Sequence, residues 1–333
     1  WRDFQTARLK AHLGVLQPSE YDQLSLEAIA AQIAGIAGFS PPSPGLGNVP
    51  AGLPSGPPVN GQPQTNMAHQ IAVIGTPGTA AGDLSQPRDV ALDAVGNLYV
   101  VDSARNVVVV YAPDGHLLRE WVPAPQGQPF TPWAIVALPD SSLFVLDSGS
   151  GRVGHFDSQG EFQGFVALPN PSAGSRGLNI GLDGVSYLSQ TPANQIIRLN
   201  SSGTVLSPVE SPSTGKLLDQ PTSAVATTNG VIFAYEPDSG HLLLLAPDGR
   251  LLFSLQAPRV ATFDAGRLAV MPDGRVLLAD VPGRRVIVYA PDGRLLGYFS
   301  VAGIPQGIAV VPAGSVAVTD GQSKLVRVYA LSG

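Results

Sequence analysis

The chain has 333 residues and a formal net charge of −6, and only 13% of its residues are charged. This balance excludes a basic surface for nucleic acid, and the lack of Cys excludes disulfides, thiolate chemistry and Cys-containing zinc sites. The 38 Gly and 31 Pro residues, with 44% hydrophobic residues, predict a folded chain with many tight turns. We therefore expect one large domain with a small appendage.

The first 39 residues have the spacing of two short amphipathic helices. Phe4, Leu9 and Leu13 recur at helical intervals, and Leu26 and Ile29 begin a second such pattern. We expect residues 1–39 to be a helical segment, able to form a homo-oligomer through these helices. The chain starts at Trp1 rather than Met, which is compatible with a membrane anchor or a parent membrane protein upstream.

Residues 40–68 form a segment dominated by Pro and Gly without an apolar period, which predicts an extended linker. From His69 onward, short apolar segments alternate with turn signals, and "YVVDSARNVVVVYAPDG" returns as "LLADVPGRRVIVYAPDG". Six such units can be aligned on the residue that closes the second strand, at Asp102, Asp147, Ser189, Tyr235, Asp280 and Asp320.

A four-stranded unit repeated about every 40 to 45 residues is typical of a β-propeller blade. Residues 69–333 therefore predict an all-β, six-bladed β-propeller, preceded by the helical segment and the linker. The sixth unit ends after its third strand, at Gly333. We expect Gln70 to Ile74 to supply the missing outer strand and so close the ring.

The repeats resemble the NHL family, as "QPRDVALDAVGNLYVVDSARNVVVVYAPDG" illustrates. The family pattern is kept most fully in blades one, two and five, at Pro87, Gly96, Asp102, Tyr111, Pro132, Asp147, Arg152, Phe156, Gly274, Asp280, Arg285 and Tyr289. Blades three and four depart from it, with Ser189 and Tyr235 at the Asp position. The resemblance implies the propeller fold. Related propellers include lyases and hydrolases with a channel metal, and extracellular parts of bacterial membrane proteins.

Four recurring carboxylates could coordinate a cation or support turns. They are Asp102, Asp147, Asp280 and Asp320. An Asp that faces a turn accepts hydrogen bonds from the backbone amides of that turn, which explains its repetition without a ligand. We interpret these residues as structural and predict no metal site and no cofactor.

A more varied set of residues stands just before or at the start of each inner strand, and chain direction places it at one mouth of the central channel. The candidate ligand-binding residues are Arg88, Asp89, Trp133, Arg176, Arg267 and Gln306. Guanidinium groups and an indole can bind an anionic or sugar-like ligand. The alternative is a solvated rim whose Arg residues pair with the recurring Asp residues.

No nucleophile elbow, phosphate-binding loop or zinc-protease motif occurs in the chain, and its five His residues do not recur on inner strands. The sequence thus predicts a non-catalytic binding or scaffold propeller that recognises a protein, peptide or glycan. We expect it at an extracellular, periplasmic or cell-surface location. The alternative is a metal-dependent lyase or hydrolase of the six-bladed propeller type.

Overall fold

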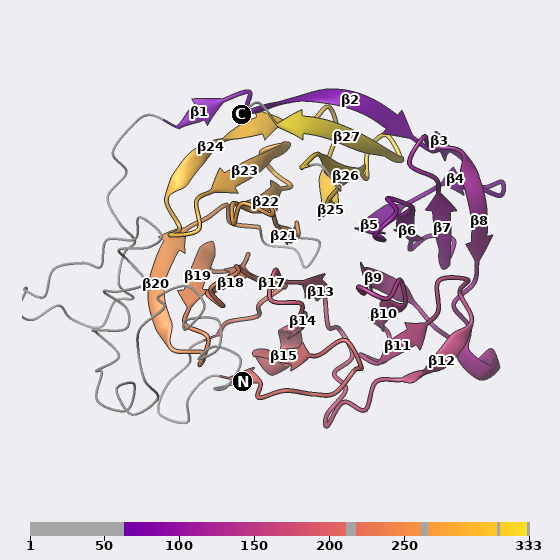
Figure 1. Ribbon diagram of the computed structural model, residues 1–333, viewed down its shortest axis with the longest axis horizontal. Coiled ribbons are helices and arrows are strands. Elements are labelled where there is room, and N and C mark those ends of the chain that lie inside the picture. The colour runs from indigo at the N-terminus through magenta and orange to yellow at the C-terminus, as the bar shows by residue number, and fades with distance from the viewer. Residues whose placement is uncertain (1–62, 211–217, 261–265, 312–313, 332–333) are drawn as a thin grey trace, which may run out of the picture. The chain divides into compact units, whose positions relative to one another are not determined.

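The computed structural model describes residues 63–210, 218–260, 266–311 and 314–331, in which six antiparallel four-stranded meanders are arranged in a ring (Figure 1). One of these sheets carries a fifth, parallel strand at its outer edge. The ring confirms the all-β, six-bladed propeller expected from the sequence. The expected helical segment at 1–39 and the linker up to residue 62 lie outside the described residues.

Each blade is a meander whose strands follow one another from the channel outward. In blades one to three the strands are β5 (Pro87–Leu92), β6 (Leu98–Asp102), β7 (Val107–Tyr111) and β8 (Leu117–Trp121); β9 (Pro132–Ala137), β10 (Leu143–Asp147), β11 (Val153–Phe156) and β12 (Phe162–Phe165); and β13 (Gly177–Ile180), β14 (Ser186–Gln190), β15 (Gln195–Leu199) and β16 (Val209–Glu210).

The remaining blades repeat this arrangement. Blades four to six consist of β17 (Ser223–Ala226), β18 (Ile232–Glu236), β19 (His241–Leu245) and β20 (Leu251–Gln256); β21 (Leu268–Val270), β22 (Val276–Asp280), β23 (Arg285–Tyr289) and β24 (Leu295–Ser300); and β25 (Pro305–Val310), β26 (Val316–Asp320), β27 (Leu325–Leu331) and β2 (Ala68–Ile74). Short 3₁₀ turns occur at Pro125–Gly127 (η1) and Thr191–Ala193 (η2).

The core is divided among the six interfaces between neighbouring blades. The second strand of each blade is buried along its whole length. These strands are rich in β-branched and aromatic residues because both of their faces pack against neighbouring sheets. One hydrophobic cluster fills each interface, including the interface between blade six and blade one. No blade can bury both faces without its neighbours.

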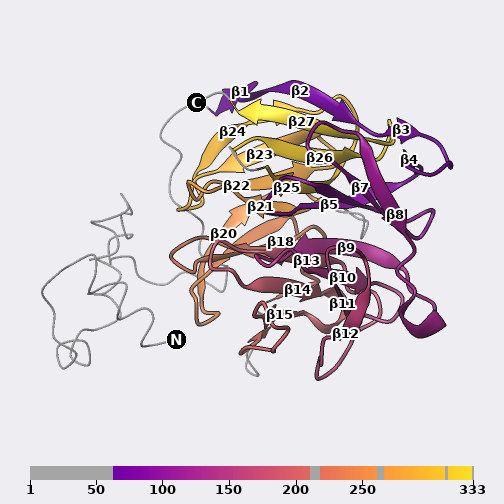
Figure 2. The same ribbon diagram turned by 45° about the vertical axis from the view of Figure 1, so that its right-hand side comes forward.

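The ring is closed by the early part of the chain, as the sequence predicted. Strand β2 pairs antiparallel with β27 from Ala68↔Leu331 to Ile74↔Val326, and it lies along the outside of blade six in both Figure 1 and Figure 2. Just before it, β1 (Gln64–Thr65) pairs with β24, and Met67 is buried between blades five and six. The ring therefore includes the last residues of the segment expected to be a linker.

A small parallel ladder, β3 (Thr76–Pro77) with β4 (Asp83–Leu84), follows β2. Within the parts of the chain that the structure describes, no helix is long and apolar enough to cross a membrane.

The pairing corrects the repeat alignment in blades three and four. Asp102 pairs with the first residue of its third strand, and the residues in that position are Gln190 and Glu236. The alignment on Ser189 and Tyr235 was wrong by one residue. Glu236 is therefore a fifth carboxylate at the blade-end position, because a longer side chain replaces Asp there.

Candidate functional site

The six candidate ligand-binding residues meet at the end of the channel where the inner strands begin. We call Arg88, Asp89, Trp133, Arg176, Arg267 and Gln306 the channel cluster. They come from five of the six blades, and each of them contacts at least one other member of the cluster. Their convergence follows from the fold, since the first residues of all inner strands surround the axis at one level.

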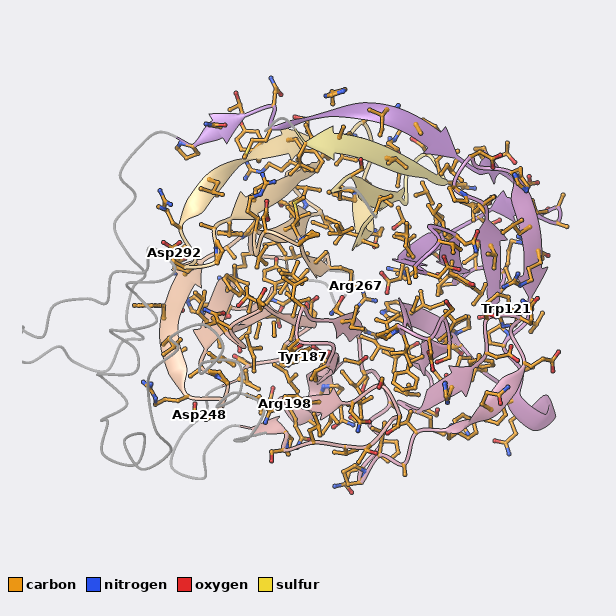
Figure 3. All side chains as sticks on the ribbon, in the orientation of Figure 1. Trp121, Tyr187, Arg198, Asp248, Arg267 and Asp292 are labelled. Atoms are coloured by element: carbon orange, nitrogen blue, oxygen red, sulfur yellow. The ribbon has the colours of Figure 1, made fainter. Side chains whose placement is uncertain are left out.

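Arg267 crosses the channel. It precedes β21 in blade five, yet it donates hydrogen bonds to the backbone carbonyl of Trp133 (3.3 Å) and to that of Arg176, in blades two and three. Figure 3 places Arg267 towards the middle of the ring, whereas Trp121 lies near its outer edge. Only 3% of Arg267 is exposed. A long buried side chain therefore ties opposite sides of the ring together.

Trp133 forms the second connection in the cluster. The guanidinium carbons of Arg88 and Arg176 lie over its ring, 4.1 and 4.5 Å from the centroid. Arg88 also donates to the Oε1 atom of Gln306 at 3.3 Å. Such cation–π contacts are strengthened by burial. These contacts of Arg88 and Arg176 join members of the cluster to one another.

Asp89 is the carboxylate of the cluster and is 3% exposed. Its Oδ2 atom accepts a hydrogen bond from the backbone N–H of Ile135 (3.1 Å), and its Oδ1 atom lies 3.9 Å from Nε of Arg267. Burial raises the pKa of Asp89 to about 6, and the positive charge of Arg267 limits that rise. Asp89 therefore exchanges a proton close to neutral pH while remaining mostly ionised at pH 7.

The blade-end carboxylates make a different set of contacts. Asp102 accepts hydrogen bonds from the backbone amides of Gln86, Ala104 and Arg105. The carboxylates of the other blades likewise accept bonds from residues of adjacent turns or connections, including the amides of Thr131, Gly283, Ile304 and Asp219 to Asp147, Asp280, Asp320 and Glu236, respectively. Each of these carboxylates is thus bonded to its own turn, to the connection before its blade, or to both.

A cavity of about 400 Å³ occupies the other half of the channel. Its lining extends from Asp89 along the inner strands to the turns that follow them, including Ala94, Pro139 and Pro272. Five blades contribute to the lining, which is mostly Ala, Val, Leu and Ile. Asp89 is the one member of the channel cluster that lines this cavity. It therefore stands at the junction between the cluster and the cavity.

Sequence reasoning missed two residues that position this site, Asn179 and Gly307. The amide of Asn179 donates to Oγ of Ser223 (3.0 Å), which also accepts the N–H of Leu268 (2.8 Å), so that blades three, four and five are connected at the channel. A Cβ atom at Gly307 would come within 2.5 Å of the Cα atom of Asp89. A polar residue in the apolar run "GLNI" and a glycine inside an inner strand were the available signals.

The residues of the channel do not fit a divalent cation. Among the described residues, no three His, Cys, Asp or Glu side chains are grouped as metal ligands. The lining carboxylate Asp93 is engaged by the amides of Val95 and Asn97 and by the Tyr99 hydroxyl. The charged neighbour of Asp89 is the cation Arg267, which repels a metal ion.

The chain matches no protein-family model and no curated protein sequence. It is similar in structure to a streptogramin B lyase, with a TM-score of 0.55 and 14% identity over 75% of this chain and 94% of the other. An inactive virginiamycin B lyase from Staphylococcus aureus with quinupristin gives 0.57 and 13%, over 78% and 99%. A gluconolactonase from Xanthomonas campestris gives 0.57 and 14%, over 79% and 99%.

Likeness at such low identity shows the six-bladed propeller fold alone. It nevertheless corrects our functional expectation, because these structural neighbours are enzymes. The expectation of a non-catalytic binding or scaffold propeller was wrong as the leading interpretation, and the enzymatic alternative is the one that the neighbours favour.

Proposed function

We propose that the chain is an enzyme that cleaves an ester or lactone bond in its central channel, with Asp89 as the general base. One observation carries this proposal: a buried carboxylate with a pKa of about 6 lines a cavity of about 400 Å³. A perturbed carboxylate in a concave site is a candidate for proton transfer. The proposal retains the lyase or hydrolase alternative that the sequence offered but not its metal ion, because the side chains of the channel do not fit a divalent cation.

The raised pKa suits Asp89 to this role. A base whose pKa approaches the working pH accepts protons more readily than an ordinary Asp and still carries its charge. In the proposed step, the carboxylate removes a proton from a water molecule while the water oxygen forms a bond to the carbonyl carbon. The C–O bond then breaks, and the departing oxygen takes the proton from Asp89. The carboxylate is regenerated and no other reactant is consumed.

Arg267 supports the ionised form of Asp89 from 3.9 Å. Its donors to the carbonyls of Trp133 and Arg176 hold the guanidinium in place, so we assign it a positioning role. The structural neighbours add support of a general kind. A lyase and a lactonase both require a base, which removes a proton from carbon in an elimination and from water in a hydrolysis.

The experiment is a screen with chromogenic aryl esters and with aliphatic and aromatic lactones, followed by kinetics of Asp89→Asn and Asp89→Ala. We expect kcat to fall by about 10²- to 10⁴-fold in both variants. The matched control is Asp114→Asn, which changes a carboxylate in an exposed turn and should leave kcat unchanged. In the native protein kcat/KM should decline as the pH falls below about 6.

Full activity in Asp89→Asn would reject Asp89 as the base. Product formed without oxygen from labelled water, together with a new carbon–carbon double bond, would identify an elimination and overturn the hydrolytic step.

We infer separately that the repeats belong to the NHL type. Asp147 with Arg152, and Asp280 with Arg285, keep the family's Asp and Arg positions, and each pair is in ionic contact, at 3.4 and 2.7 Å. The family assignment, like the location outside the cytoplasm, stays a prediction from the sequence.

A further inference from the structure

The two ends of the channel differ in how a molecule could reach Asp89. Where the inner strands begin, Arg267 spans the channel from blade five to blades two and three. Arg88 and Gln306 join blades one and six at the same level. A molecule approaching from this end would have to separate buried charged groups from their hydrogen-bond partners, which is costly.

The opposite end has no comparable obstruction among the described residues. The cavity extends from Asp89 to the turns after the inner strands, and Ala94, Pro139 and Pro272 in its lining are exposed to solvent. These side chains are small or compact. A molecule can therefore pass between these turns without breaking an ion pair or a hydrogen bond of the cluster.

The lining also defines what the cavity would hold. Its polar side chains are Asp89, Asp93 and Asn179. Asp93 is bonded to its own turn, and Asn179 donates to Ser223 and to the carbonyl of Ala224. The remaining lining is aliphatic, without a cation to bind an acid and without a series of hydrogen-bonding groups for a polyol. Burial of an apolar body is then the main source of affinity.

We propose that the substrate is a neutral, largely apolar ester or lactone that enters through the mouth formed by the turns after the inner strands. That the bound molecule is a substrate rests on the proposed function. Its chemical class and its route of entry rest on the cavity. The sequence had favoured the other mouth, because the more variable side chains lie there. In the structure those side chains bond to one another across the channel, and of them Asp89 alone lines the cavity.

The test measures binding of a neutral, carbonyl-bearing fluorescent probe, prodan, so that it does not depend on turnover. Ala94→Trp places a large side chain at the proposed mouth. Ala302→Trp makes the same substitution at an exposed position on the connection that leads into β25, at the opposite end. Prodan should bind the native protein, Ala94→Trp should weaken binding by at least about tenfold, and Ala302→Trp should change it by less than about twofold.

Circular dichroism and thermal melting of both variants verify that each is folded. Weaker binding in Ala302→Trp with native binding in Ala94→Trp would overturn the route. Preference for the anionic probe anilinonaphthalene sulfonate over prodan would overturn the substrate class, as would no prodan binding at all. Native prodan binding in a protein that cleaves no ester or lactone would instead reject the proposed function, so that the two failures are distinguishable.

Discussion

The two halves of the channel are built from the same inner strands, yet their chemistry is opposite. Where these strands begin, charged and aromatic side chains cross the axis and bond to one another. Where they end, aliphatic residues leave a cavity. The repeated sequence pattern of the blades does not encode this contrast, because it specifies strands and turns rather than the residues at the axis. The non-repeating residues are therefore where a function of this ring should be sought.

We expect the largest loss of stability from a substitution in the half of the channel that holds the channel cluster. Arg267→Met removes a buried cation from beside Asp89 and leaves two backbone carbonyls without this donor. Loss of one partner of a buried ion pair costs about 3–5 kcal/mol. The matched control is Arg275→Met in the same blade but at the cavity end, where Arg275 pairs with half-exposed Asp273 and should contribute less than about 1 kcal/mol.

Urea denaturation at pH 7 measures both free energies of unfolding. Equal losses of unfolding free energy in the two variants would show that the buried contacts of Arg267 contribute no more to stability than the exposed ion pair of Arg275. The pKa of Asp89 should also rise further in Arg267→Met, since the opposing positive charge is gone.

A smaller effect concerns the junction of the two halves and depends on pH. The pKa of Asp89 is raised from 3.8 to about 6 in the folded protein, so the folded state holds this proton at pH values where the unfolded state has released it. The contribution of Asp89 therefore lowers stability progressively as the pH rises from about 4 to about 6, by roughly 3 kcal/mol in total. Below pH 4 the penalty is absent.

Asp89→Asn cannot ionise and should lack this decline. The measurement is the difference in unfolding free energy between the native protein and the variant at pH 4 and at pH 7. A difference that does not change between these pH values would place the pKa of Asp89 near its ordinary value and would weaken its assignment as the base.

We expect the smallest effect from Gly307→Ala, a substitution that displaces Asp89 without altering its side chain. A Cβ atom in Gly307→Ala would lie 2.5 Å from the Cα atom and 2.7 Å from Oδ1 of Asp89. Overpacking of this kind costs about 1–3 kcal/mol. Gly149→Ala, whose Cβ atom would lie 3.3 Å from its nearest neighbours, should cost less. A Gly307→Ala protein that melts like the native one would show that the inner strands can separate freely.

The sequence was sufficient for the ring and for the convergence of the six channel-cluster residues at one end of the inner strands. Alternating apolar strands and Pro-Asp-Gly turns predict blades wherever they recur, and chain direction places Arg88, Trp133 and Arg267 at one level. The alignment failed by one residue in blades three and four because Gln190 and Glu236 do not look like Asp. A propensity argument also cannot tell that three Arg side chains turn inward.

The state of Asp89 could not be read from the sequence for a related reason. Its pKa depends on burial between blades, on the N–H of Ile135 and on Arg267, which comes from the far side of the ring. The cavity depends likewise on which axial residues are long and which are short in every blade together. The pKa of Asp89 and the shape of the cavity are set by contacts among all the blades of the closed ring, whereas the structure of a blade is encoded in the local sequence of each repeat.

The pairing of β2 with β27 has a consequence for the order in which the molecule is made. β2 precedes the other five blades in the chain, but its partner β27 is the last strand of the ring to be synthesised. Until β27 has been synthesised, β2 lacks its partner strand, and the face of blade one that packs against blade six is uncovered. Closure is thus a late, long-range event, and during the wait the exposed strand edge is open to pairing with another copy of the chain.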